Sequence, residues 1–209
     1  MKLCFCIVIR EKDTSICGQS ARNSRLCAIL TVLQFLVAFV SLLQHIYSIR
    51  KHRAIFACRS NITVNSTIDE KFLAYDIIIF DYGLMHRVLG TTECVANYLD
   101  GGFMRSLWCL SYANSLCLLF ISSFFNRRIW LLWPALLMQS SYTLGLAVLT
   151  MATAPKMLDA LGGKVDAAFG TAFIIYIIGF MYNWLFTFIL WHHYWYIEKK
   201  LKSSIQFIS

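Results

Sequence analysis

Four long apolar stretches, none with an Asp, Glu, Lys or Arg in its interior, constrain this chain more than any other feature. Each reaches or exceeds the ~20 residues that a helix needs to cross ~30 Å of hydrocarbon. In lipid every backbone polar group must be satisfied within its own element, so runs of this length are expected to be helices. We therefore predict an all-α membrane protein, a four-helix transmembrane bundle with spans at 27–49, 106–125, 129–151 and 168–195.

The composition agrees with a membrane protein and argues against nucleic acid as a partner. Hydrophobic residues make up 58% of the 209 residues and charged residues only 14%, a balance that would leave a soluble domain prone to aggregate. The formal charge is +8, but the Lys and Arg residues cluster just outside the apolar stretches. Membrane orientation and lipid headgroups explain them better. The expected partners are membrane lipids and other membrane proteins, including copies of this chain.

The long segment between the first two spans, residues 50–105, indicates the topology. Lys and Arg are divided almost equally between the two sides, so their number does not decide the orientation. Two N-glycosylation sequons begin at Asn61 and Asn65, and both fall in this segment. We therefore place residues 50–105 outside the cell or in a lumen. The other expected segments are a cytosolic N-tail (1–26), a cytosolic turn (126–128), a short outer loop (152–167) and a cytosolic C-tail (196–209).

The cysteines divide along the same topology. Cys58 and Cys94 would lie in an oxidising compartment, where we expect one disulfide between them, the alternative being two unpaired thiols. Cys4, Cys6 and Cys17 precede the first span and are candidates for S-palmitoylation. The spacing of the N-terminal cysteines does not follow a paired CxxC pattern, so no zinc site is expected.

Each span carries one amide side chain near its middle, within roughly 6 Å of the midpoint. The four are expected to meet in one polar layer, because amides avoid hydrocarbon and pair between helices. A structural clamp is the favoured interpretation, and a ligand or permeation site is the alternative. The predicted layer consists of Gln34, Asn114, Gln139 and Asn183.

The sequence offers no catalytic, metal or cofactor motif. Proton relays and ion-coupled transporters need ionisable residues at membrane depth, and the interiors of the four spans have no carboxylate, Lys or Arg. His192 and His193 stand among Trp and Tyr residues, which is typical of an interfacial aromatic belt. We therefore expect a protein that is not an enzyme and uses no cofactor.

The run NRRIWLLWP, from Asn126 to Pro134, resembles the hinge between the second and third helices of insect four-transmembrane proteins. These include the Pasiflora proteins of septate junctions and are loosely similar to lysosome-associated tetraspan proteins. A last span that runs through Trp191 to Tyr196 into a basic tail is similar too, as is the short cysteine-bearing N-tail. The long loop is also similar to that of claudins and clarins, but the claudin signature of a tryptophan, Gly-Leu-Trp and cysteines is absent.

This resemblance implies a non-enzymatic tetraspan that assembles with other membrane proteins, in the plasma membrane at cell junctions. The first alternative is an endosomal or lysosomal trafficking adaptor. The Pro-Pro-x-Tyr tails of many lysosomal relatives are absent, since the only prolines are Pro134 and Pro155. A small channel or transporter subunit is the second alternative.

Overall fold

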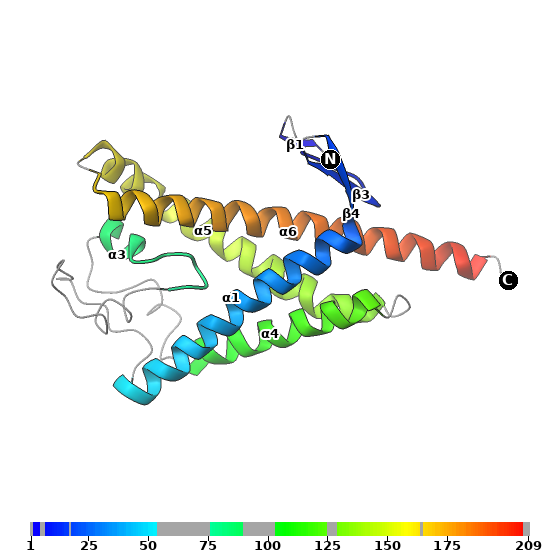
Figure 1. Ribbon diagram of the computed structural model, residues 1–209, viewed down its shortest axis with the longest axis horizontal. Helices are drawn as coiled ribbons and strands as arrows, with labels where there is room; N and C mark the ends of the chain where they lie inside the picture. Colours follow the sequence, from blue (N-terminus) through cyan, green and yellow to red (C-terminus); the bar gives the residue numbers. More distant parts are fainter. Residues whose placement is uncertain are drawn as a thin grey trace. The chain divides into compact units, whose positions relative to one another are not determined.

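A computed structural model of the chain describes residues 2–4, 7–16, 18–53, 76–89, 103–124, 129–163 and 165–206. Over these ranges the chain is mostly helical, as predicted (Figure 1). A 3-10 turn, η2 (Ile129–Leu132), precedes α5, and the short helix α3 (Leu84–Leu89) lies between α1 and α4. The long helices are α1 (Asn23–His52), α4 (Phe103–Phe124), α5 (Trp133–Gly162) and α6 (Ala167–Gln206).

Three of the described helices are long and apolar enough to cross a membrane. They cover Asn23–Lys51, Ile129–Gly162 and Ala167–Ser203. These helices mark the chain as a membrane protein. The apolar part of α4, Ser106–Ser122, is shorter, so the fourth span remains a prediction.

Two helices extend well beyond the apolar stretches that predict them. Helix α5 continues to Gly162 with Pro155 inside it, so most of the segment expected as a loop at 152–167 is helical. Helix α6 likewise runs through the expected C-tail as far as Gln206. The end of an apolar run marks where hydrocarbon burial ends, whereas Ala, Leu, Met and Lys continue a helix readily on their own propensity.

A small antiparallel sheet, which the all-α prediction missed, precedes α1. Its strands β1 (Lys2–Cys4), β2 (Ile7–Ile9), β3 (Asp13–Ile16) and β4 (Gln19–Arg22) are hydrogen-bonded in sequence order. Ile16 pairs with Gln19, and Gly18 supplies a positive φ of 86° in the tight turn between them. The strands are too short for a clear alternation of apolar and polar residues, which explains why sequence patterning did not reveal them.

The buried and exposed faces of α1 are inverted relative to those of a helix in a soluble protein. Its buried face is largely polar or small, whereas large aliphatic and aromatic side chains are exposed. Such a distribution suits a helix whose outer face meets lipid, because polar groups in hydrocarbon need partners inside the protein. The buried face consists of Cys27, Thr31, Gln34, Ala38, Ser41, Gln44, His45 and Ser48.

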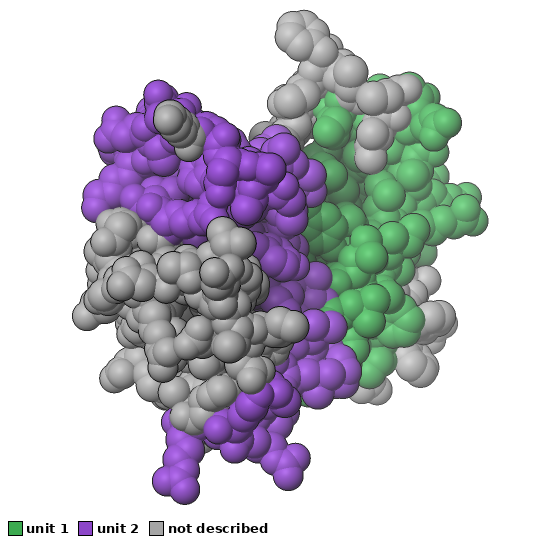
Figure 2. Space-filling view, turned by 60° about the vertical axis from the view of Figure 1, so that its left-hand side comes forward, with its two compact units in different colours: residues 1–36, 112–143, 182–209 green, residues 37–111, 144–181 purple. Residues whose placement is uncertain are grey.

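The chain divides into two compact units, coloured separately in Figure 2. Unit 1 contains residues 1–36, 112–143 and 182–209, and unit 2 contains residues 37–111 and 144–181. Each of the four long helices therefore contributes residues to both units.

In unit 1 the buried side chain of Asn23 joins the sheet to the first turn of α1. Its Nδ2 donates to the carbonyls of Arg10 (2.7 Å) and Glu11 (3.0 Å), and its Oδ1 accepts a bond from the Thr14 hydroxyl (2.6 Å). Lys199 on α6 forms an ion pair with Glu11, which is half exposed. One amide thus satisfies three polar groups, while the surface ion pair adds little.

We predict that Asn23→Ala loosens the sheet from α1. Losing a buried partner of three polar groups should cost about 1–3 kcal/mol, which corresponds to roughly five-fold to 150-fold in the opening of the sheet. Tryptic cleavage after Arg10 and Lys12 should accelerate accordingly. Ser20→Ala, at an exposed position of β4, is the control and should cleave at the parent rate; equal rates for both variants would disprove the anchoring role.

Candidate functional site

A network of polar side chains lies buried in unit 1, where α4, α5 and α6 meet. The Tyr112 hydroxyl of α4 donates to Gln139 Oε1 on α5. Gln139 Nε2 in turn donates to Asn183 Oδ1 on α6 at 3.1 Å. All three side chains are completely buried. The Gln139 amide thus links three helices through its two ends.

Two threonines one turn further along complete this network. The hydroxyls of Thr143 on α5 and Thr187 on α6 lie 2.7 Å apart. The Thr143 hydroxyl also lies 2.9 Å from the carbonyl oxygen of Gln139, one turn before it. The Thr187 hydroxyl lies 2.8 Å from the carbonyl oxygen of Asn183 in the same way. Both hydroxyls lie 3.4 Å from Gln139 Nε2. We call Tyr112, Gln139, Thr143, Asn183 and Thr187 the amide network.

Gln34 of α1 belongs to the same unit and is completely buried. Its side chain lies near the Tyr112 hydroxyl. Neither Gln34 Oε1 nor Nε2 has a partner with hydrogen-bond geometry in the described part of the chain. Helix α1 is instead joined to α6 by the Tyr182 hydroxyl, which donates to the carbonyl of Leu30 at 2.6 Å.

The structure thus brings together two of the four predicted amides, Gln139 and Asn183, and buries Gln34 beside them. The structure does not bring Asn114 into this network, because its side chain is exposed on α4. The prediction placed Asn114 by its depth within the span, and depth does not specify on which side of the helix a residue lies. Asn114 lies about 200° around α4 from Tyr112, the residue that actually faces the network. Tyr112, Ser115 and Leu119 are buried on one face of α4, and that shared face indicates which side of the helix meets the network.

The network can hold helices together but offers no acid or base. Its members are amides, hydroxyls and one phenol, and every one of them is neutral at physiological pH. Among the described residues, no group of three or more His, Cys, Asp or Glu side chains is arranged to hold a metal ion. Its chemistry is therefore that of an interhelical hydrogen-bonded clamp.

Several predicted sites lie outside the described residues. These are the sequons at Asn61 and Asn65, the disulfide pair Cys58 and Cys94, and the palmitoylation candidates Cys6 and Cys17. Cys4 lies on β1. All of these assignments remain predictions.

In unit 2 an ion pair lies at the beginning of α6. Arg87 Nη1 is 2.7 Å from Asp166 Oδ1 and 2.9 Å from Oδ2. Asp166 also caps α6, since its Oδ1 accepts the Phe169 N–H at 2.9 Å. The hydrogen bond from Arg87, followed by the backbone bond from Phe169, lowers the pKa of Asp166 below the ordinary value of a carboxyl group. Both partners are half exposed, so solvent screens the pair.

We predict that replacing Gln139 weakens the bundle far more than replacing Asn114. Gln139→Leu leaves Tyr112 and Asn183 short of a buried partner, and should lower the free energy of unfolding by about 2–3 kcal/mol. Asn114→Leu removes an exposed amide and should change the unfolding free energy by less than about 0.5 kcal/mol or raise it. Unfolding in mixed detergent and SDS micelles measures both. Equal losses would contradict the assignment of the clamp.

We also predict a pH dependence from Asp166. Because its pKa is lowered by folding, the carboxylate stabilises the native state fully above the pKa of the unfolded chain. This stabilisation is lost as the pH falls through the lower pKa of the folded chain. Asp166→Asn should therefore lower the thermal midpoint at pH 7 and match the parent chain at strongly acidic pH. A constant difference between the two across that range would contradict it.

Neither the characterised proteins nor the solved structures include a significant match to this chain. The family model described as "Family of unknown function (DUF8774)" matches residues 6–202, which is most of the chain. The protein therefore belongs to the DUF8774 family.

Proposed function

We propose that this protein is a non-enzymatic, multi-pass membrane component that assembles laterally with other membrane proteins at cell junctions of the plasma membrane. The observation that carries the proposal is the inverted polarity of α1, with polar side chains inside and large apolar ones outside. Such a chain uses its polar groups to hold its own helices together. Its exposed apolar faces are then free to meet lipid or neighbouring helices.

The amide network supports a scaffold over a conducting or catalytic role. Its hydrogen bonds join α4, α5 and α6 to one another, and no carboxylate, Lys, Arg or His side chain takes part. Proton- and ion-driven machines place charged residues at such positions. The resemblance to insect septate-junction tetraspans supports the choice of cell junctions.

An exposed seam on α5 supports lateral association. Four exposed apolar residues recur there every seven residues, the spacing at which one helix packs along another. Gly145 lies beside this seam, and a Cβ added there would meet no atom within 4 Å. An open glycine lets a second helix approach closely. The seam consists of Leu137, Leu144, Met151 and Leu158.

We predict that the tagged protein concentrates at the lateral contacts of polarised epithelial cells. It should also co-purify with a differently tagged copy or with other junction proteins after mild cross-linking. Gly145→Leu should reduce this co-purification several-fold by blocking the seam. Cys117→Leu, at an exposed position of α4, adds similar bulk and should leave it unchanged.

The same imaging distinguishes the alternative. Exclusive presence in intracellular vesicles would contradict a junction component and favour an endosomal or lysosomal trafficking adaptor. Unchanged co-purification of Gly145→Leu would exclude the α5 seam as the assembly surface.

A further inference from the structure

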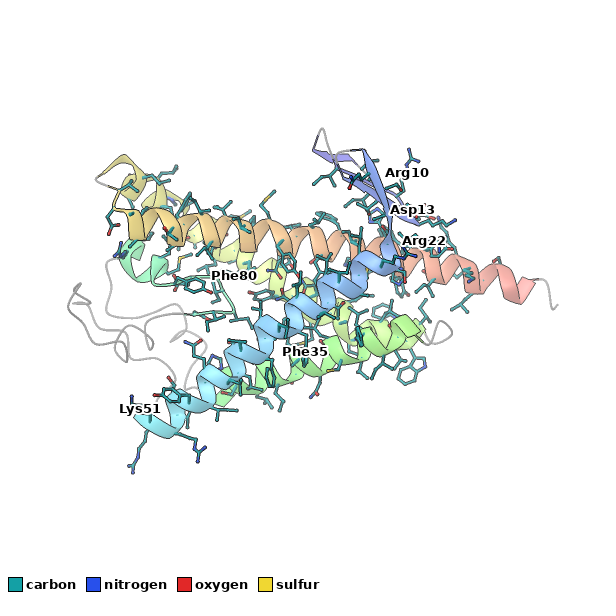
Figure 3. All side chains as sticks on the ribbon, in the orientation of Figure 1. Arg10, Asp13, Arg22, Phe35, Lys51 and Phe80 are labelled. Carbon is teal, nitrogen blue, oxygen red and sulfur yellow. The ribbon has the colours of Figure 1, made fainter. Side chains whose placement is uncertain are left out.

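Residues 76–89 contain α3 and the turns that precede it, and in unit 2 they pack against α6. The ring of Phe80 rests on the α6 backbone at Gly179: an added Cβ at Gly179 would lie 2.3 Å from Phe80 Cδ2 and 2.4 Å from Cγ. Figure 3 labels Phe80 on this segment. Only glycine leaves room for the ring at this position, so Gly179 forms a notch for Phe80.

The notch lies in the membrane-spanning part of α6. Gly179 lies within the apolar helix Ala167–Ser203. The same turns of α6 expose Ile174, Ile178 and Met181 on their other side. Large apolar side chains exposed at this level are expected to meet hydrocarbon, so Phe80 lies at hydrocarbon depth.

The other end of the segment reaches the beginning of α6. Arg87 pairs there with Asp166, immediately before the helix. At 1.5 Å per residue, Asp166 and Gly179 are separated by about 20 Å along α6. The segment therefore extends from the end of a spanning helix to well inside its length.

Six backbone N–H groups of the segment find acceptors within the segment itself, as a non-helical backbone at membrane depth requires. Buried Asp76 accepts the Ile78 N–H at 3.2 Å, and buried Asp81 accepts the Met85 N–H at 2.6 Å. Further N–H groups bond to carbonyls of the same segment, namely those of Phe80, Asp81, Leu84 and Arg87.

The conformation also requires support from its surroundings. Phe80 and Tyr82 have positive φ values of 59° and 44°, which side-chain-bearing residues rarely adopt. Such residues persist where packing over-determines them. Ile78, Leu84 and Met85, all buried, supply that packing.

We propose that residues 76–89 are a re-entrant strap, a part of the connection between α1 and α4 that turns back into the membrane layer and locks onto the Gly179 notch. The strap carries the carboxylates of Asp76 and Asp81 into the interior as caps for its own turns.

Depth is tested by spin labels attached through single added cysteines in the reconstituted full chain, with the signal of the parent chain subtracted. Tyr82→Cys reports on the strap, whose Tyr82 side chain is exposed. Ile178→Cys is the lipid-facing reference and Asp159→Cys the aqueous reference. The label at position 82 should be more accessible to oxygen than to a water-soluble nickel chelate, as is expected of the label at position 178. Preference for the chelate, as expected at Asp159, would overturn the proposal.

The notch is tested by two matched substitutions on the spanning helices. Gly179→Ala should displace Phe80 and increase the reaction of Ile78→Cys with a water-soluble maleimide at least ten-fold. Gly162→Ala makes the same chemical change where no atom lies within 4 Å of the added Cβ, and should leave the reaction unchanged. Because both substitutions favour helix formation, general unfolding is an improbable source of a difference. Equal reaction rates in the two variants would overturn the docking of Phe80 on Gly179.

Discussion

Hydrocarbon offers no hydrogen-bond partner, and this constraint accounts for the inverted polarity of α1. An amide or hydroxyl at membrane depth must find its partner within the protein. Helix α1 responds by burying Thr31, Gln34 and Ser41 while exposing Leu33, Leu36 and Leu43. A soluble helix would reverse the two faces.

The two units meet this constraint in different ways. In unit 1 the side chains of Tyr112, Gln139 and Asn183 bond to one another across three helices, so the polar groups of the helices satisfy each other. In unit 2 the side chains of Asp76 and Asp81 accept the N–H groups of Ile78 and Met85 within the same segment, and the ring of Phe80 lies against Gly179. The first arrangement connects helices, and the second brings a connecting segment against one of them.

The sequence predicts the features that depend on local composition, such as the helices. It does not predict which side of a helix is buried or which distant residues are in contact. The apolar runs predicted the helices, and amide depth predicted that Gln139 would meet Asn183. Depth does not distinguish the sides of a helix, so Asn114 was placed inside when Tyr112 faces the network. The contact of Phe80 with Gly179 joins residues almost a hundred positions apart and leaves no periodic pattern. The buried aspartates were missed because they lie between the apolar runs rather than inside them.

Helix α1 should turn its polar face toward the protein and its apolar face toward lipid. Nitroxide labels placed singly along α1, from position 31 to position 48 of the reconstituted chain, measure it through their accessibility to oxygen. We expect the accessibility to oscillate with a period of about 3.6 residues, with maxima at Leu33, Leu36, Val40 and Leu43 and minima at Gln34, Ser41, His45 and Ser48. Uniform accessibility, or maxima at the polar positions, would contradict it.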